Sequence, residues 1–240
     1  MNDTINAILF DLDGTLLDSN MDVFLPHYFK MLTARVAHIL PPEKFIAHLI
    51  QATDVMIAND GRATNEAVFA DAFYPLVGQP REKVEPIFKD FYANDFPALR
   101  QHTRRKPEAR QVVQRAFDLG CDVVIATNPV FPAIAIEQRL EWAGVADFSY
   151  HLVTTYENSR AAKPSLLYYE HIVGEIGQRA EACLMVGDED MDMVAAHLGC
   201  LTFLVPGPRT ALAPTTPQPT YRGTLADLWA RFQEWEVSHG

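Results

Sequence analysis

Short apolar runs alternate with helical patterns through most of the second half of the chain. Helical patterns cover 107–119, 132–143, 165–176 and 192–198, and apolar runs cover 7–10, 122–126, 151–155, 183–186 and 201–205. Three of these helical patterns are followed by a glycine (Gly120, Gly144 and Gly199), the residue that suits a left-handed helix C-cap. Apolar, non-alternating strands separated by helices predict a parallel sheet covered on both faces, which is a doubly wound, Rossmann-like α/β fold.

The stretch from 17 to 96 departs from this alternation. One helical face carries Phe24, Leu25, Tyr28, Leu32, Val36 and Ile39. Pro41-Pro42 is expected to end that helix, and further amphipathic helical patterns follow without a convincing strand. We therefore expect an α-helical cap domain over 17–96, inserted into an α/β core domain made of 1–16 and 97–240. The segment Asp18-Ser19 is expected to be its first hinge.

The C-terminal part predicts a loop and a closing helix. Residues 206–223 are rich in Pro and Thr, which favours a loop. Thr224 is expected to cap the last helix. The apolar stripe of that helix is Leu225, Leu228, Trp229, Phe232 and Trp235, and a structural role is expected for it.

Composition limits the classes of partner and the compartment. The formal net charge of -11 over 240 residues disfavours nucleic acid and anionic membranes as partners. Neither a signal peptide nor a membrane span is evident. The three cysteines lack metal or disulfide spacing, which favours a reducing compartment, so the cytoplasm is expected. A monomer or homodimer is expected, without support from particular residues.

The strongest chemical signal follows the first apolar run. Asp11 and Asp13 stand one residue apart, and Gly14 and Thr15 come next. Alternate residues of a strand point the same way, so both carboxylates are expected to face one small volume. Crowded carboxylates repel unless a cation neutralises them or one takes up a proton, and both outcomes serve catalysis. An acidic turn that caps the next helix is the alternative.

Further polar groups follow other predicted strands or open a helix. Thr127-Asn128 follows the run 122–126, Lys163-Pro164 opens a helix, and an acidic stretch at 188–192 follows the run 183–186. Ligands bind at the carboxyl ends of the strands in an open α/β sheet, so these groups are expected to converge. Taken singly, they also suit a helix N-cap, a solvated lysine and an acidic helix N-terminus. Their joint occurrence in order favours a site.

These groups carry a resemblance to a known superfamily. Asp11-Leu12-Asp13-Gly14-Thr15, Thr127-Asn128, Lys163-Pro164 and Gly187-Asp188 with Asp192 match its four motifs in order. The chain resembles the haloacid dehalogenase-like (HAD) hydrolases, on the branch with a helical (C1) cap that includes phosphoglycolate phosphatase-like enzymes. The resemblance covers essentially the whole chain.

The resemblance implies a role for each carboxylate. Asp11 would be the nucleophile that forms an aspartyl-phosphate, and Asp13 the general acid and then the base. Mg²⁺ would be held by Asp11, the backbone carbonyl of Asp13, and Asp188. Asp192 would orient a water on the cation or Lys163 from outside the ligand set.

The resemblance also implies how the phosphoryl group is held. The Thr127 hydroxyl, the Asn128 backbone N–H and backbone donors near Gly14 would bind its oxygens, and Lys163 would add positive charge. Family members that break other bonds lack an aspartate at the position of Asp13, so phosphoryl-oxygen chemistry is implied. A small phosphorylated metabolite is the expected substrate, with a phosphoglycolate-like molecule, a sugar phosphate and a nucleoside monophosphate all open.

The predicted cap offers one candidate residue for substrate choice, and two other functions fit the same fold. Arg62, in a turn between cap helices, is a candidate for binding a substrate carboxylate or second phosphate, and a solvent-exposed arginine is the alternative. The basic residues Arg100, Arg104, Arg105 and Lys106 are expected to form a solvated hinge. A phosphomutase acting on a sugar phosphate and a non-catalytic partner-binding protein on the same fold are the alternative functions.

Overall fold

A parallel sheet forms the centre of the molecule. The computed structural model describes residues 5–208 and 210–239. The strands are β1 (Ala7–Phe10), β4 (Asp122–Ile125), β5 (Leu152–Val153), β6 (Cys183–Gly187), β7 (Leu201–Leu204) and β8 (Tyr221–Arg222). They lie in the order β5-β4-β1-β6-β7-β8, and every neighbouring pair is parallel. The predicted doubly wound α/β fold is confirmed.

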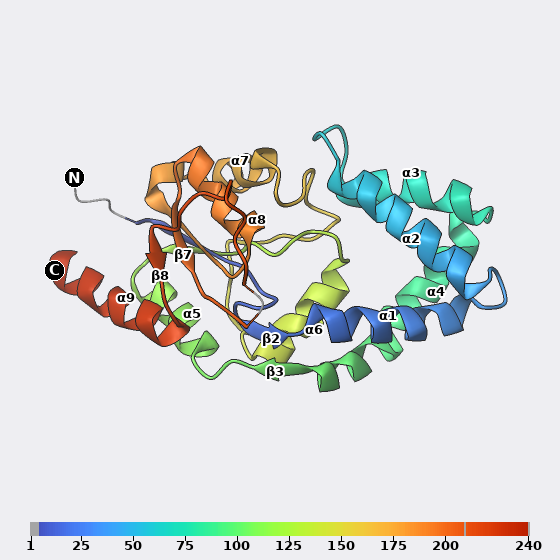
Figure 1. Cartoon of the computed structure of the whole chain (residues 1–240), viewed down its shortest axis with the longest axis horizontal. Helices are drawn as coiled ribbons and strands as arrows, with labels where there is room; N and C mark the ends of the chain where they lie inside the picture. The colour runs from blue at the N-terminus through green and yellow to red at the C-terminus, as the bar shows by residue number, and fades with distance from the viewer. Residues whose placement is uncertain (1–4, 209, 240) are drawn as a thin grey trace.

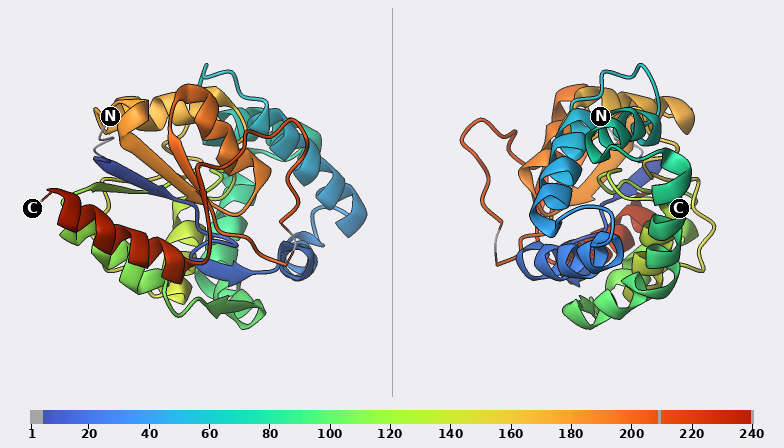
Figure 2. Two further views of the ribbon diagram at one scale, coloured as in Figure 1. Left: turned by 60° about the vertical axis from the view of Figure 1, so that its left-hand side comes forward. Right: turned by 90° about the vertical axis from the view of Figure 1, so that its right-hand side faces the viewer.

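Helices cover both faces of this sheet (Figures 1 and 2). One layer contains α5 (Ala109–Asp118), α6 (Ala133–Ala143) and α9 (Leu225–His239), and the other contains α7 (Leu166–Glu175), α8 (Asp190–Met193) and the 3-10 helix η3 (Val194–Leu198). Another 3-10 helix, η2 (Ala180–Ala182), precedes β6. On β1, Ile8 and Phe10 join the first layer, whereas Ala7 and Leu9 join the second. This division follows from the alternation of side chains along a strand.

A helical module extends from one end of the sheet (Figure 1). It contains α1 (Met21–Val36), α2 (Pro42–Ile57), α3 (Asn65–Val77), α4 (Arg81–Asn94) and the 3-10 helix η1 (Phe96–His102). The first helix ends before the proline pair, and Pro42 opens the second one, where its missing N–H costs no hydrogen bond. Phe96 stacks on Trp142 of α6 at 5.5 Å, so the module and the core layer form continuous packing.

The two chain crossings between the helical module and the core form a small ribbon. Strand β2 (Leu17–Ser19) pairs antiparallel with β3 (Thr103–Arg105). The expectation of no strand between 17 and 96 is therefore wrong at its edge, because a three-residue strand is too short to show a period. The predicted hinge at Asp18-Ser19 lies in this ribbon. The domain boundaries at 17 and 97 stay a prediction, and residues 1–4 and 240 lie outside the described residues.

The C-terminal loop prediction is wrong at its end. Tyr221 and Arg222 form β8, which pairs with Phe203 and Leu204 of β7. The two paired strands are separated by a long connection, so no local sequence pattern predicts the pairing. Thr224 does cap α9, since its hydroxyl accepts a hydrogen bond from the Asp227 N–H at 3.2 Å.

Among the described residues, the structure holds no helix that is long and apolar enough to cross a membrane.

Candidate active site

Asp11 and Asp13 lie where β1 leaves the sheet. The Asp11 N–H donates to the Val186 carbonyl at 2.9 Å, which continues the pairing of β1 with β6 for one more residue. Both aspartates line the same cavity, as predicted. Their carboxylates have different partners, however: Asp11 contacts Lys163, whereas Asp13 contacts Arg139 and accepts a hydrogen bond from the Ser19 hydroxyl at 3.0 Å.

Lys163 is held between two carboxylates. Its Nζ lies 2.7 Å from Asp11 Oδ1 and 2.6 Å from Asp192 Oδ1, and its side chain is 1% exposed. Burial disfavours the ammonium, but Asp11 and then Asp192 outweigh it and raise the pKa of Lys163. The lysine predicted from its place before a proline is thus a buried cation beside the candidate nucleophile.

Burial and crowding disfavour the charged forms of two aspartates. The pKa of Asp11 is raised, first by burial, although Lys163 opposes this; Asp192 and Asp188 add to the rise. Burial, Asp192 and Glu189 raise the pKa of Asp188 to about 7, although a hydrogen bond from Thr15 at 3.2 Å opposes the shift. A cation in this volume would relieve the repulsion and favour the carboxylate forms.

The carboxylates suit a hard divalent cation. One oxygen each from Asp11, Asp188 and Asp192 lies within 4.8 Å of the others, and oxygen ligands are those Mg²⁺ prefers. Both Asp192 oxygens are already used: one contacts Lys163, and the other accepts the N–H groups of Asp188 and Glu189 at 3.1 Å each. Asp192 therefore fits a residue that positions Lys163 and the loop after β6, and Asp11 and Asp188 fit the ligand set.

Thr127 and Asn128 follow β4 and line the same cavity. The Thr127 carbonyl accepts hydrogen bonds from the Thr154 hydroxyl at 2.7 Å and the Tyr168 hydroxyl at 2.9 Å. Asn128 Oδ1 accepts the Lys163 N–H at 3.2 Å. These bonds fix the loop after β4 against the segment that carries Lys163, so the predicted residues converge at one end of the sheet.

At Gly14, the backbone of the turn after β1 lies close to the Asp188 carboxylate. Its φ of +90° is a conformation that other residues avoid, and a Cβ placed there would lie 2.2 Å from Asp188 Oδ2. Glycine is thus needed for Asp188 to reach the end of β1.

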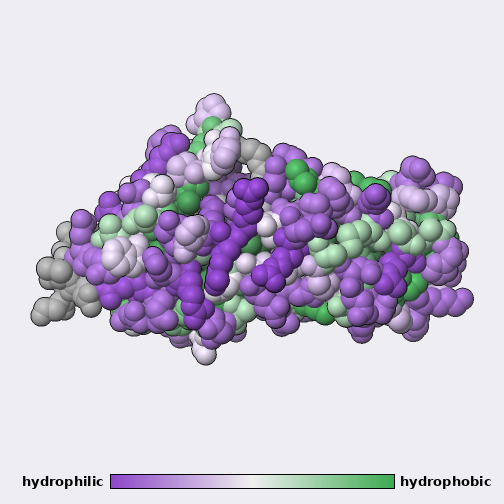
Figure 3. Space-filling view, turned by 90° about the horizontal axis from the view of Figure 1, so that it is seen from below, coloured by the Kyte–Doolittle hydropathy of each residue, from purple (hydrophilic) through white to green (hydrophobic). Residues whose placement is uncertain are grey.

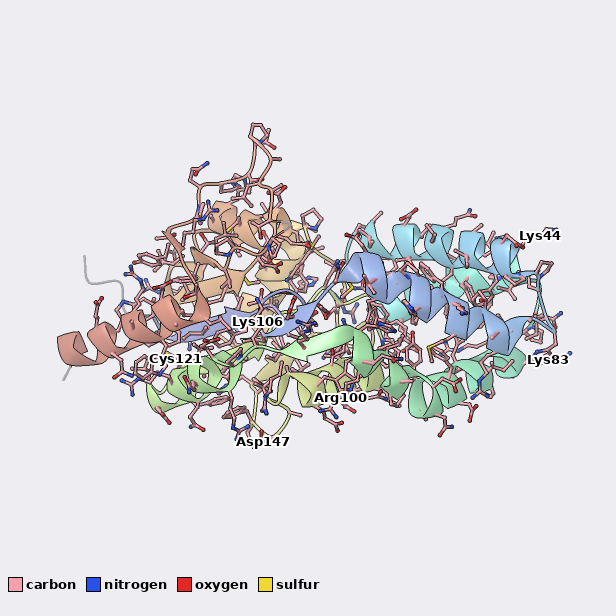
Figure 4. All side chains as sticks on the ribbon, turned by 60° about the horizontal axis from the view of Figure 1, so that its bottom comes forward. Lys44, Lys83, Arg100, Lys106, Cys121 and Asp147 are labelled. Atoms are coloured by element: carbon pink, nitrogen blue, oxygen red, sulfur yellow. The ribbon has the colours of Figure 1, made fainter. Side chains whose placement is uncertain are left out.

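Lys106 also reaches this turn, because its ammonium donates to the Gly14 carbonyl. The expected solvated basic hinge is therefore wrong for Lys106, which is half-buried and lies over the core side of the view in Figure 4. Arg105 is exposed, as expected, although its guanidinium donates to the Ala143 and Gly144 carbonyls at 3.0 and 2.8 Å. Arg100 and Arg104 are exposed, as expected.

Sequence reasoning missed Arg139. This residue of α6 is 1% exposed, pairs with Asp13, and lies 4.6 Å over the Phe131 ring. The helical pattern could have identified Arg139, because this residue falls on the same helix face as the buried Ala135 and Ile136. A buried arginine on an apolar stripe needs an acidic partner, and Asp13, whose side chain is 15% exposed, provides it.

The structure does not bring Arg62 to the site. Arg62 is exposed and is not among the residues that line the cavity. Its turn instead approaches α7, since a Cβ on Gly61 would lie 3.0 Å from Leu167. Lys44, near the start of α2, lies at the end of the helical module farthest from the sheet (Figure 4).

The cavity itself joins the strand ends to the helical module. It has a volume of about 950 Å³, and its lining includes Asp11 and Asp188 from the core and Tyr28, Phe69 and Phe88 from the module. The aspartates are thus at one end of a space whose other walls include side chains from all four long helices of the module, α1, α2, α3 and α4. This arrangement suits a substrate whose reacting group meets the core and whose remainder meets the helices.

Comparison with known proteins agrees with this geometry. Residues 5–198 match the family model of haloacid dehalogenase-like hydrolases. A phosphoglycolate phosphatase of Vibrio parahaemolyticus is 26% identical over 200 residues, covering 83% of this chain and 82% of the relative. One of Mannheimia succiniciproducens is 28% identical over 211 residues, covering 83% and 85%.

Solved structures share the fold. A HAD phosphatase from Thermococcus onnurineus is 19% identical with a TM-score of 0.60, covering 95% of this chain and 97% of that one. A 2-haloacid dehalogenase from Pseudomonas syringae is 16% identical with a TM-score of 0.68, covering 97% and 100%. With the ordered motifs, the strand-end carboxylates and the family match together, the chain belongs to the haloacid dehalogenase-like hydrolase family.

Proposed function

We propose that this protein is a Mg²⁺-dependent phosphatase that hydrolyses a small phosphomonoester through an aspartyl-phosphate on Asp11. The observation that carries the proposal is the buried contact of Asp11 with Lys163 at the end of the cavity. The relatives named phosphoglycolate phosphatase support phosphoester chemistry.

In the first step, an Asp11 oxygen attacks phosphorus while the bond from phosphorus to the ester oxygen breaks. Asp13, protonated when the substrate is bound, gives its proton to that oxygen, so the product leaves as an alcohol and Asp13 becomes the carboxylate that pairs with Arg139. Its contacts with Arg139 and Ser19 hold the Asp13 carboxyl group at the boundary between core and helical module.

In the second step, water attacks the phosphorus of the aspartyl-phosphate. Asp13, now a carboxylate, takes a proton from this water, and the bond between phosphorus and the Asp11 oxygen breaks. Inorganic phosphate leaves, and both carboxyl groups return to their starting states.

Charge balance and alignment supply most of the acceleration in such a reaction. Lys163 and donors from Thr127 and Asn128 neutralise and orient the phosphoryl oxygens. Asp11, the Asp13 carbonyl and Asp188 would hold Mg²⁺, which adds positive charge beside the same oxygens when it is bound. Asp192 keeps the Lys163 ammonium in place.

The proposal also covers the domain division, the partner, the compartment and the oligomeric state. We assign residues 17–96 to a cap that covers the cavity, and 1–16 with 97–240 to the catalytic core. A small phosphorylated metabolite is the partner, and the cytoplasm is the compartment, which the buried, unpaired cysteines Cys121, Cys183 and Cys200 suit. A monomer or homodimer is proposed.

The test is phosphate release from a panel of phosphomonoesters, with Mg²⁺ and with EDTA. We expect release that depends on Mg²⁺ and that falls by at least about 10³-fold in Asp11→Asn. Asp118→Asn is the matched control, since Asp118 is an exposed aspartate on α5. Isomer formation without phosphate release would establish a phosphomutase instead, and inactivity toward every compound would leave a non-catalytic role.

A further inference from the structure

The cavity continues from the carboxylates into a region walled by aromatic side chains. These are Phe29, Phe69, Tyr74, Phe88, Tyr92 and Phe131, and all are partly exposed. Two of the exposed large hydrophobic residues of the chain, Ile50 at 46% and Ile134 at 37%, also line it. Elsewhere, the face seen in Figure 3 is mostly hydrophilic with small hydrophobic patches.

The cations of the helical module that line this region are already paired. Arg81 contacts Glu66 at 2.6 Å and Glu85 at 2.7 Å, and Lys89 contacts Glu85 at 2.9 Å. Hydrogen bonds from Arg81 and then Lys89 lower the pKa of Glu85 to about 2, so the carboxylate stays ionised. A carboxylate or second phosphate on a substrate would therefore be repelled by these acids as well as attracted by the cations.

Arg139 offers no better partner for an anionic substrate group. Its guanidinium is 1% exposed, and its charge is matched by Asp13. Its remaining amino group, Nη2, is buried and has no partner among the described residues. An anionic group of the substrate away from the core end of the cavity therefore meets no accessible unpaired cation among the described lining residues, whereas Asp11, Thr127 and Asn128 line the core end.

The volume points to a large leaving group. Cavities of about 300–1,000 Å³ suit drug-sized ligands, and this one measures about 950 Å³. Phosphoglycolate, the substrate for which those relatives are named, carries only one methylene group and a carboxylate beyond the phosphate ester oxygen. Such a molecule would leave the aromatic walls in contact with water.

Resting on the proposed phosphatase activity, we propose that the substrate is the phosphomonoester of an uncharged alcohol with an aromatic body. Its phosphate binds at Asp11 and Lys163, and its ring lies against Phe69 and Tyr74 of α3 and Phe88 of α4. Aromatic pairs favour offset or edge-to-face contact, and Phe69, Phe73 and Phe88 already form such a group, with ring centroids 5.0 and 5.6 Å from Phe73.

The test compares benzyl, naphthylmethyl and para-carboxybenzyl phosphates with phosphoglycolate, as kcat/KM of the full-length protein with Mg²⁺. All are esters of alkyl alcohols, so the leaving oxygen is of one kind. We expect benzyl and naphthylmethyl phosphates to exceed the two carboxylated substrates by at least about tenfold. A preference for phosphoglycolate, or equal values for the benzyl pair, overturns the inference and keeps the phosphatase. If the protein hydrolyses none of these compounds and no other phosphomonoester, the result overturns both this inference and the proposed phosphatase function.

Two variants assign the effect to the aromatic walls and the paired charges. Phe69→Ala should raise KM for naphthylmethyl phosphate at least about fivefold and leave methyl phosphate unchanged, whereas Trp229→Ala, on the remote helix α9, should change neither. The double variant Glu66→Gln with Glu85→Gln removes the acids that hold Arg81. It should raise kcat/KM for para-carboxybenzyl phosphate relative to that for benzyl phosphate. Equal effects of Phe69→Ala on large and small substrates, or an unchanged ratio in the double variant, contradict the proposal.

Discussion

At the scale of single residues, the site is a set of buried charges that neutralise one another. Lys163 stands between Asp11 and Asp192, and Arg139 pairs with Asp13. A buried charge without a partner is costly, whereas a well-placed pair recovers much of that cost. Each of these residues therefore depends on another one that is distant in the sequence.

Replacing Arg139 should show this dependence. Arg139→Met keeps an unbranched apolar stem but leaves Asp13 without its ion pair, so the free energy of unfolding should fall by about 3–5 kcal/mol. Urea unfolding measures it. The double variant Arg139→Met with Asp13→Asn should lose less than the sum of the single changes.

The matched control is Arg110→Met, which breaks the exposed pair with Asp147 and should cost about 0–1 kcal/mol. Equal losses for the Arg139 and Arg110 variants would argue against a buried pair at Asp13.

At the scale of elements, the first turn of α3 joins the helical module to the core. Asn65 is fully buried, and its amide donates to the carbonyls of Pro129 at 3.2 Å and Ala161 at 3.0 Å. Its Oδ1 accepts a hydrogen bond from Asn59 at 2.8 Å. One amide thus connects the helical module to the loop after Thr127 and the loop before Lys163.

Asn65→Ala should weaken this junction. The change removes the donor to two buried carbonyls, those of Pro129 and Ala161, and each costs about 1–3 kcal/mol when it stays unsatisfied; Asn59 keeps its hydrogen bond to the Ala63 carbonyl. We expect a loss of about 2–5 kcal/mol in urea unfolding and faster proteolysis near the junction.

Asn94→Ala serves as the control for Asn65→Ala, since Asn94 makes an exposed hydrogen bond to Asp90 and should change stability by less than about 0.5 kcal/mol. Unchanged proteolysis in Asn65→Ala would mean that other contacts hold the junction.

At the scale of the whole molecule, the acidic chain concentrates carboxylates where the sheet meets the helical module. In the cation-free protein, the pKa of Asp188 is about 7, against 3.8 ordinarily. Between about pH 4 and 7 the folded state therefore keeps a proton that the unfolded chain has released. By this linkage, the contribution of Asp188 to the free energy of unfolding falls as pH rises through this window.

Urea unfolding in EDTA at pH 5 and pH 8 tests the linkage. The loss of stability between these values should be smaller in Asp188→Asn than in the wild type, and unchanged in Asp118→Asn. Mg²⁺ should restore stability at pH 8 more than at pH 5, because it competes with the proton. An Asp188→Asn protein with the wild-type pH dependence would show that Asp188 does not titrate in this range.

Local hydrophobic patterns in the sequence predicted most strands of the sheet and the central residues of the site. Strands β1, β4, β6 and β7 are mostly apolar without alternation, so each segment by itself indicates burial on both faces. Asp11, Thr127, Lys163 and Asp188 stand at or after such runs or beside a proline, and chain order sufficed to predict their convergence.

Other features exist only through contacts between distant segments. Strands β2, β3 and β8 are two or three residues long, and hydrogen bonds to a remote partner define them. Arg139 and Lys106 belong to the site because the fold buries them against Asp13 and Gly14, while Arg62 stays outside because its turn faces α7. The sequence by itself determined the strands and the reactive groups that end them, since hydrophobic periodicity is local. Tertiary structure alone decided which charges are paired and what fills the walls of the cavity, since those depend on which surfaces the fold brings together.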